Sequence, residues 1–144
     1  MIFGIGTDAI EVARIEAALQ RHGSRFIERI LGPREMMLHA ARAARSPRRG
    51  LLFLATRFAA KEAVSKALGL GMRQPMHWRA VQIVNARSGR PEVLADAPME
   101  IFLRERRLQV HVSVTDLDTL ALAYAVAETI DPQGAARLGP GAGP

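Results

Sequence analysis

The chain has 144 residues, 49% of them hydrophobic, and its 20 Lys and Arg outnumber 14 Asp and Glu, giving a net charge of +6. That length fits one domain, and the absence of cysteine excludes disulfides, thiolate nucleophiles and Cys-ligated metal sites. We find neither a signal peptide nor the ~18 apolar residues that a membrane span needs, so we expect a cytoplasmic protein without a membrane partner. The basic charge favours an anionic partner such as nucleic acid, a phosphorylated cofactor or an acidic protein, although an arginine-rich background composition gives the same bias.

The first half of the chain reads as one short strand followed by helices. In chain order we expect a strand over residues 2–7 that ends at Asp8, helices over residues 11–22, 24–31 and 33–44, a polar break over residues 46–50 and a helix over residues 51–68. Val12, Ile15 and Leu19 recur at helical spacing before Gly23, a typical helix stop. The last of these helices is so rich in apolar residues that we expect it to be central and largely buried.

The second half reads mainly as strands. We expect a strand around Val81 and Ile83, a turn over residues 87–91, a returning strand over residues 92–94, a helix over residues 98–106 and a hairpin over residues 110–127. The fold class is α+β, with helices packed on a small antiparallel sheet in a single domain over residues 1–130. The Gly-, Pro- and Ala-rich tail over residues 131–144 has the composition of a disordered segment.

Gly4 and Gly6 superficially match a dinucleotide-binding fingerprint. That motif needs a strand before its glycines and a helix N-terminus after them, whereas here only three residues precede Gly4. The glycines therefore lie inside the first strand and the Rossmann interpretation fails. Asp8, where we expect the strand to meet the helix, has two interpretations: a helix cap or a functional carboxylate.

The chain has only two lysines, Lys61 and Lys66, and both lie in its most apolar helix. Phe58, Glu62 and Lys66 follow one another at four-residue spacing and so share one helix face. An ordinary surface ion pair has the same spacing, but the flanking sequence is too apolar for a solvated helix, where charges need a partner, a metal or a ligand. Lys61 falls about 100° around the helix from Glu62, and we expect it on the outer side of the motif.

Asp8 and Glu62 together suggest a magnesium site. Mg²⁺ prefers oxygen ligands and keeps waters and substrate phosphates in its shell, so two protein carboxylates suffice. Lys66, Arg57 and His111 could then contact phosphate groups. This set is typical of phosphoryl transfer, in which a metal and cations stabilise charge.

On the expected hairpin, His111, Ser113 and Thr115 alternate with valines and point to one sheet face. A polar solvent-facing edge would look the same. No Asp or Glu lies in strand register with His111 and no nucleophile elbow is present, which argues against a Ser-His-Asp hydrolase.

Three blocks in this order resemble the holo-acyl-carrier-protein synthases, the small 4'-phosphopantetheinyl transferases. They are Gly4-Ile5-Gly6-Thr7-Asp8, the block Arg57-Phe58-Ala59-Ala60-Lys61-Glu62-Ala63-Val64-Ser65-Lys66-Ala67-Leu68-Gly69, and His111-Val112-Ser113-Val114. Trp78 and Asn85-x-x-x-Gly89-x-Pro91 also fit the family pattern, and the resemblance spans residues 1 to about 128. The family usually continues the last block with Ser-His, where this chain has Thr115-Asp116.

The resemblance implies a 4'-phosphopantetheinyl transferase-like fold and an enzyme that moves phosphopantetheine from coenzyme A to a serine of apo acyl carrier protein, for fatty acid biosynthesis. It implies that Asp8 and Glu62 hold Mg²⁺ and that Lys66 stabilises charge on the phosphoryl or leaving group. Glu62, directly or through an ordered water, is the candidate base, with Lys66 as the alternative proton acceptor. The coenzyme A site would include Arg57, Lys66, Gly89, Arg90, Pro91, His111 and Ser113.

The resemblance also implies a homotrimer with active sites between subunits. Acyl carrier proteins are acidic, so we expect a basic docking surface on the first helices, formed by Arg14, Arg21, Arg25, Phe26 and Ile27. A merely solvated arginine face is the alternative. The resemblance gives no role to nucleic acid.

Two competing functions stay open at this point. A small basic nucleic-acid-binding module fits the net charge, but the chain has few aromatic residues and no helix-turn-helix, KH or RRM signature. A different Mg²⁺-dependent nucleotide enzyme on the same scaffold is the other.

Overall fold

The computed structural model describes residues 1–130, so the tail over residues 131–144, which we expected to be disordered, lies outside the described residues. In chain order the elements are β1 (Ile2–Glu11), α1 (Val12–His22), α2 (Ser24–Ile30), α3 (Pro33–Arg45), α4 (Pro47–Leu68), β2 (Val81–Asn85), β3 (Pro91–Ala95), α5 (Ala97–Glu105), β4 (Leu108–Asp116) and β5 (Leu120–Thr129). None of the helices within the described range is long and apolar enough to cross a membrane.

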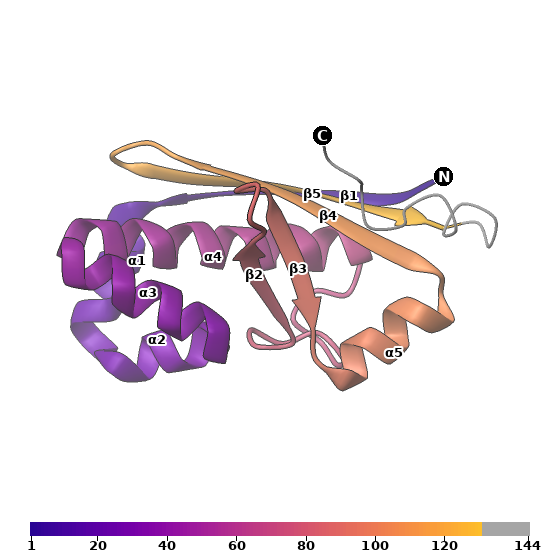
Figure 1. Cartoon of the computed structure of the whole chain (residues 1–144), viewed down its shortest axis with the longest axis horizontal. Coiled ribbons are helices and arrows are strands. Elements are labelled where there is room, and N and C mark those ends of the chain that lie inside the picture. The colour runs from indigo at the N-terminus through magenta and orange to yellow at the C-terminus, as the bar shows by residue number, and fades with distance from the viewer. Residues whose placement is uncertain (131–144) are drawn as a thin grey trace.

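Three strands form an antiparallel sheet in the order β1-β5-β4, and β2 and β3 form a separate antiparallel hairpin. Figure 1 shows α4 running along one face of the three-stranded sheet, with the other helices on that same side. The α+β class expected from the sequence is confirmed. In the part of the chain that the structure describes, no helix covers the opposite sheet face.

The packing of the sheet on α4 depends on small side chains. The alanines of β5 alternate with larger residues, and Ala121, Ala123, Ala125 and Ala127 are buried against the helix layer. A Cβ atom on Gly4 or Gly6 would collide with a backbone carbonyl of α4. Because these residues lack bulk, β1 and β5 lie close to the central helix, which is itself largely buried as its composition predicted.

Two expected boundaries are wrong. β1 continues past Asp8 to Glu11, because it stays paired with β5 as far as the Glu11–Leu120 pair, so Asp8 lies inside the strand. The expected polar break over residues 46–50 shrinks to Ser46, since α4 already begins at Pro47. Proline suits the first helical position, where its missing N–H would have no partner anyway.

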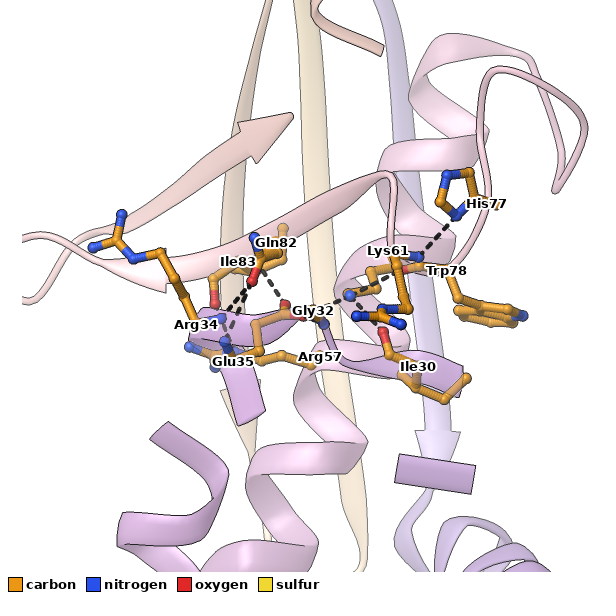
Figure 2. A network of polar contacts seen from close by, with 11 residues as sticks. Ile30, Gly32, Arg34, Glu35, Arg57, Lys61, His77, Trp78, Gln82 and Ile83 are labelled. Atoms are coloured by element: carbon orange, nitrogen blue, oxygen red, sulfur yellow. Dashed lines mark hydrogen bonds and ion pairs between the residues drawn. The ribbon is translucent and has the colours of Figure 1, made fainter. Parts of the chain in front are cut away.

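Lys61 lies in the interior, and the expectation that it lies on the outer side of the motif is wrong. Its side chain and that of Glu35 are both 0% exposed, and its Nζ lies 2.7 Å from Glu35 Oε2 (Figure 2). The ammonium also donates to the carbonyls of Ile30, at 2.6 Å, and Trp78, at 2.7 Å. Burial lowers the pKa of Lys61, and the Glu35 carboxylate opposes that shift.

Glu35 uses both carboxylate oxygens in the same network. Oε2 accepts the Gly32 backbone N–H at 2.9 Å, and Oε1 accepts the Ile83 backbone N–H at 2.7 Å. The pair therefore joins the end of α2, the start of α3, the middle of α4, the segment before β2 and β2 itself (Figure 2). A buried ion pair offsets its desolvation cost only when the remaining hydrogen-bonding groups are also satisfied, as they are here.

We expect Lys61→Met to lower the free energy of unfolding by about 3–5 kcal/mol, because it leaves the Glu35 carboxylate buried without its counter-charge. The double variant Lys61→Met/Glu35→Gln should recover part of this loss, since the amide removes the uncompensated charge and its one oxygen still accepts one of the two backbone N–H groups that Glu35 binds. Urea unfolding of the two variants and the wild type measures both effects. A double variant less stable than Lys61→Met would contradict the uncompensated charge as the cause.

Candidate active site

The first group of site residues lies where β1 crosses α4. Lys66 Nζ donates to the Thr7 carbonyl and to Asp8 Oδ1, both at 3.0 Å. The Lys66 side chain is 51% exposed and that of Asp8 is 17% exposed. The ammonium therefore faces solvent, while the carboxylate is partly buried beneath it. The glycines that precede Asp8 allow this approach, since β1 could not lie so close to α4 with larger residues at those positions.

Glu62 lies one helical turn before Lys66 and is half-buried. Burial raises the pKa of its carboxyl, the charge of Asp8 raises it further, and Lys66 opposes the shift. Glu62, Asp8 and Lys66 therefore form one electrostatic cluster, as the helix spacing predicted for Glu62 and Lys66. A carboxylate with a raised pKa beside a second carboxylate is an arrangement common at functional sites.

The cluster fits a magnesium ion by the chemistry of its donors. It offers two carboxylates, which are the oxygen ligands that Mg²⁺ prefers, and their mutual repulsion is what a cation would relieve. No group of three or more His, Cys, Asp or Glu side chains suited to a metal occurs within residues 1–130.

An aromatic pair adjoins the cluster on α4. The rings of Phe58 and Trp78 are stacked with their centroids 4.5 Å apart. Phe58 lies one turn before Glu62 on the same helix face, and the Trp78 carbonyl is held by Lys61. The sequence placed Phe58 on this face, whereas its partner became visible only in the folded chain.

A second group of site residues surrounds Arg57. Its buried guanidinium donates through Nε to the Ile83 carbonyl at 3.0 Å and through Nη2 to Asn85 Oδ1 at 2.9 Å. Burial lowers the pKa of Arg57 to about 10, with Glu35 opposing the shift and Arg42 adding to it. Arg57 thus stays protonated near neutral pH, and an anion bound beside it would stabilise the charge that burial disfavours.

Arg57 lines a pocket of about 640 Å³ with three arginines that the sequence analysis missed, Arg42, Arg45 and Arg49. Arg42 and Arg57 both lie over the Phe53 ring, at 5.1 and 4.1 Å from its centroid. Nothing in the sequence indicated a site at Arg42, Arg45 or Arg49, because these three residues lie outside any motif. Arg42 and Arg45 are on α3 and Arg49 is in the first turn of α4. The pocket suits an anionic ligand with an aromatic or apolar part.

Asp116 lines the same pocket. It stands where the resembled family usually has a histidine, so this chain brings a carboxylate to an arginine-lined pocket.

A neighbouring pocket of about 370 Å³ brings together Arg90, Pro91 and His111, three of the residues expected at the coenzyme A site. Gly89 belongs to the adjoining turn, where its carbonyl accepts from Asn85 Nδ2 at 2.7 Å. Asn85 and Pro91 pair across the β2–β3 hairpin, so this hairpin borders both pockets. Ser113 lies on the uncovered sheet face opposite Tyr124, outside the residues that line either pocket.

His111 has an acidic neighbour that the sequence analysis overlooked. Its direct strand partner is Val126, as expected for a residue with no carboxylate in register. Glu128, two residues further along β5 on the same face, nevertheless lies with its Oε1 2.7 Å from His111 Nε2. Strand register predicts only the direct pair, whereas diagonal neighbours in a sheet are also within reach of long side chains.

The two groups of site residues lie on different sides of α4. Arg57 and Glu62 are five positions apart in the sequence, which places their side chains about 140° apart around the helix axis. Asp8 is on β1 and His111 on β4, and these are the two edges of the sheet. A single chain therefore does not bring Asp8, Glu62 and Lys66 together with Arg57, His111 and residues 89–91.

Comparison with known proteins identifies the family. The family model of the 4'-phosphopantetheinyl transferase superfamily matches residues 4–125. The chain belongs to this superfamily. Over 127 residues it is 55% identical to a holo-[acyl-carrier-protein] synthase of Ralstonia nicotianae, covering 88% of this chain and 92% of that protein. A protein of the same name from Herminiimonas arsenicoxydans is 56% identical over 128 residues, covering 89% and 98%.

Solved structures confirm the expected transferase-like fold. The holo-[acyl-carrier-protein] synthase of Neisseria meningitidis aligns with a TM-score of 0.82 at 35% identity, over 90% of this chain and all of that one. A holo-(acyl-carrier-protein) synthase of Bacillus anthracis, solved in complex with CoA (3',5'-ADP), aligns with a TM-score of 0.75 at 33% identity, over 90% and 99%. These comparisons establish a transferase but do not assign roles to individual residues.

We expect Glu62→Gln to stabilise the metal-free protein at neutral pH. The pKa of Glu62 is raised above its ordinary value of 4.5, so the ionised carboxylate penalises the folded state at higher pH. The gain should vanish below pH 4.5, where Glu62 is protonated in both states, and grow as the pH rises through the folded-state pKa. Chemical denaturation in chelator across this range measures it.

The same substitution in an Asp8→Asn background serves as the control. There the gain should be smaller, because only the part of the shift that comes from burial persists. An equal gain at all pH values would mean that Gln stabilises the helix for a reason unrelated to charge.

Proposed function

We propose that this enzyme transfers 4'-phosphopantetheine from coenzyme A to a serine of apo acyl carrier protein, releasing adenosine 3',5'-bisphosphate. The observation that carries the proposal is the cluster of Asp8, Glu62 and Lys66 at the crossing of β1 and α4. The close similarity to relatives named holo-[acyl-carrier-protein] synthase over most of their lengths supports the same substrate pair. We further propose a role in fatty acid biosynthesis and a cytoplasmic location.

The reaction needs a proton acceptor and stabilised phosphate charge. The serine oxygen attacks the phosphorus that bears pantetheine, a P–O bond forms, and the bond to the departing adenosine bisphosphate breaks. Glu62, whose raised pKa makes it a better base than an ordinary carboxylate, takes the serine proton directly or through an ordered water. Lys66, half-exposed on the same face, stabilises the transferring phosphoryl or leaving oxygens. Lys66 as the proton acceptor is the alternative.

Asp8 and Glu62 are the residues that would hold Mg²⁺. The ion would neutralise pyrophosphate charge, as metal ions do in phosphoryl transfer.

The arginine-lined pocket and the neighbouring pocket with His111 are proposed to bind coenzyme A. Arg57 provides a buried cation, and Phe53 provides an apolar surface that the guanidinium groups of Arg42 and Arg57 contact. Arg90, Pro91 and His111 line the adjacent pocket, with Gly89 in its turn and Ser113 further along the same strand as His111. Arg45 and Arg49 join this set as phosphate-binding candidates that the sequence analysis did not include.

We propose that the complete active site forms between subunits of a homotrimer. The two groups of site residues lie at opposite sheet edges, so a cyclic assembly can place one subunit's Asp8 side next to another's His111 side. The sheet face away from α4 exposes apolar side chains, with Phe3 51%, Ile5 55% and Tyr124 46% exposed. Such a contiguous apolar face is typical of a subunit interface.

The carrier protein is proposed to dock on α1 and α2. Arg14, Arg21 and Arg25 are exposed, as a surface for an acidic partner requires. Phe26 and Ile27 are only partly exposed, because they pack against the core, so they would form the base of the docking surface. Lys61, the residue before Glu62, donates to the carbonyl of Ile30 at the end of α2. This contact fixes the docking surface relative to the catalytic cluster.

Incubation with coenzyme A, Mg²⁺ and apo acyl carrier protein should add one phosphopantetheine to the carrier, read as its intact mass. Glu62→Ala should lower turnover by about 10²- to 10⁴-fold, the usual contribution of a general base. A known transferase run in parallel verifies the carrier. Absence of the adduct would reject the transferase proposal. Unchanged nucleic-acid binding by Glu62→Ala, without any transfer, would favour the binding module.

Mixing two impaired variants tests whether the site is shared between subunits. Glu62→Ala removes one half of the site and Arg45→Ala/Arg49→Ala weakens the other, so subunits exchanged between the two should regain about a quarter of the wild-type sites. A mixture of Glu62→Ala with a chain carrying all three substitutions is the matched control and should stay inactive. Absence of recovery after verified subunit exchange would place the whole site in one chain.

A further inference from the structure

We infer that Glu128 is a positioning residue, which holds the imidazole of His111 so that its free nitrogen donates to a phosphate group of coenzyme A. The inference rests on the proposed function and adds a residue to which nothing in the motif assigns a role.

The geometry joins the two side chains across neighbouring strands. His111 is on β4 and Glu128 near the end of β5, and their Nε2 and Oε1 atoms are 2.7 Å apart. The side chains are 50% and 41% exposed within the single chain. His111 also lines the pocket that contains Arg90. His111 lies on the edge strand β4 and lines a pocket, whereas Glu128 lies behind it on the central strand β5, so the histidine is the member of the pair that faces the pocket.

The hydrogen-bonding capacity of the two groups sets the direction of the contact. An ionised carboxylate can only accept, so Nε2 must carry the hydrogen that Glu128 receives. Nδ1 is then free, and it can donate to a phosphate oxygen only if the ring is doubly protonated. A doubly protonated ring donates from both nitrogens, from Nε2 to Glu128 and from Nδ1 to the phosphate.

The charged groups around His111 fit an anion at this position. Arg90 and Glu92 line the pocket that His111 also lines, one attracting an anion and the other opposing it. The amino group of Met1 lies 3.4 Å from the Thr129 carbonyl, one residue beyond Glu128. With Glu128 bonded to His111, its negative charge is directed at the imidazole.

A double-mutant cycle on purified, assembled protein tests the inference. Glu128→Ala should raise the KM for coenzyme A by roughly tenfold, the scale of a lost charge-assisted hydrogen bond, with kcat and the KM for the carrier unchanged. Glu128→Gln keeps an acceptor and should lie between wild type and Glu128→Ala. In a His111→Ala background, Glu128→Ala should have no further effect. Glu105→Gln, which changes an exposed carboxylate on α5, is the matched control for charge.

Three results would overturn the inference. An equal effect of Glu128→Ala with and without His111 would show that it acts independently of the histidine. A lower KM would show that Glu128 blocks the phosphate site. A changed molar mass in light scattering would show that it maintains the assembly instead.

Failure of the proposed function is distinguishable from failure of the inference. Calorimetric titration of coenzyme A needs no turnover. It is carried out on the four proteins of the cycle, which are the wild type, Glu128→Ala, His111→Ala and the double variant, so coupling between His111 and Glu128 is measurable even if no carrier is modified. Wild-type transfer without coupling rejects the role of Glu128 alone, whereas no binding of coenzyme A rejects both.

Discussion

The structure depends on the buried ion pair of Lys61 and Glu35. Two charges in an apolar interior are costly, and they are tolerated because every polar atom of the pair has a partner. The partners come from α2, α3, β2 and the segment that precedes β2, so the pair sets how these elements surround α4. These contacts fix α4 relative to its neighbours, and Glu62 and Lys66 lie on the same helix.

A second constraint is the small residues between the sheet and α4. Gly4 and Gly6 let β1 lie against the helix, and the β5 alanines keep the sheet close along its length. Asp8 therefore reaches Lys66 from a strand, where its backbone is fixed by pairing with β5. The glycines that superficially matched a nucleotide-binding motif thus serve packing, and through packing they position a carboxylate.

The part of the site that could be predicted from the sequence is the part that lies on one element or in one motif. Glu62 and Lys66 share a helix face by spacing alone. Arg45 could not be found this way, because its meeting with Arg57 depends on how α3 packs on α4. Arg49 was missed because the sequence placed it in a polar break, whereas it lies in the first turn of α4. Glu128 was missed for a similar reason, since its contact with His111 is diagonal across two strands.

The sequence by itself determined the α+β class, the element order, the family and the Glu62–Lys66 face, because these follow from local periodicity and from a contiguous motif. Only the tertiary structure decided that Lys61 is buried and Lys66 exposed. The two lysines are five residues apart on one helix, and which side of that helix meets Glu35 depends on contacts with segments up to 31 residues away in the chain. The structure also showed that the two groups of site residues lie at opposite sheet edges, since strand order is a property of the folded chain.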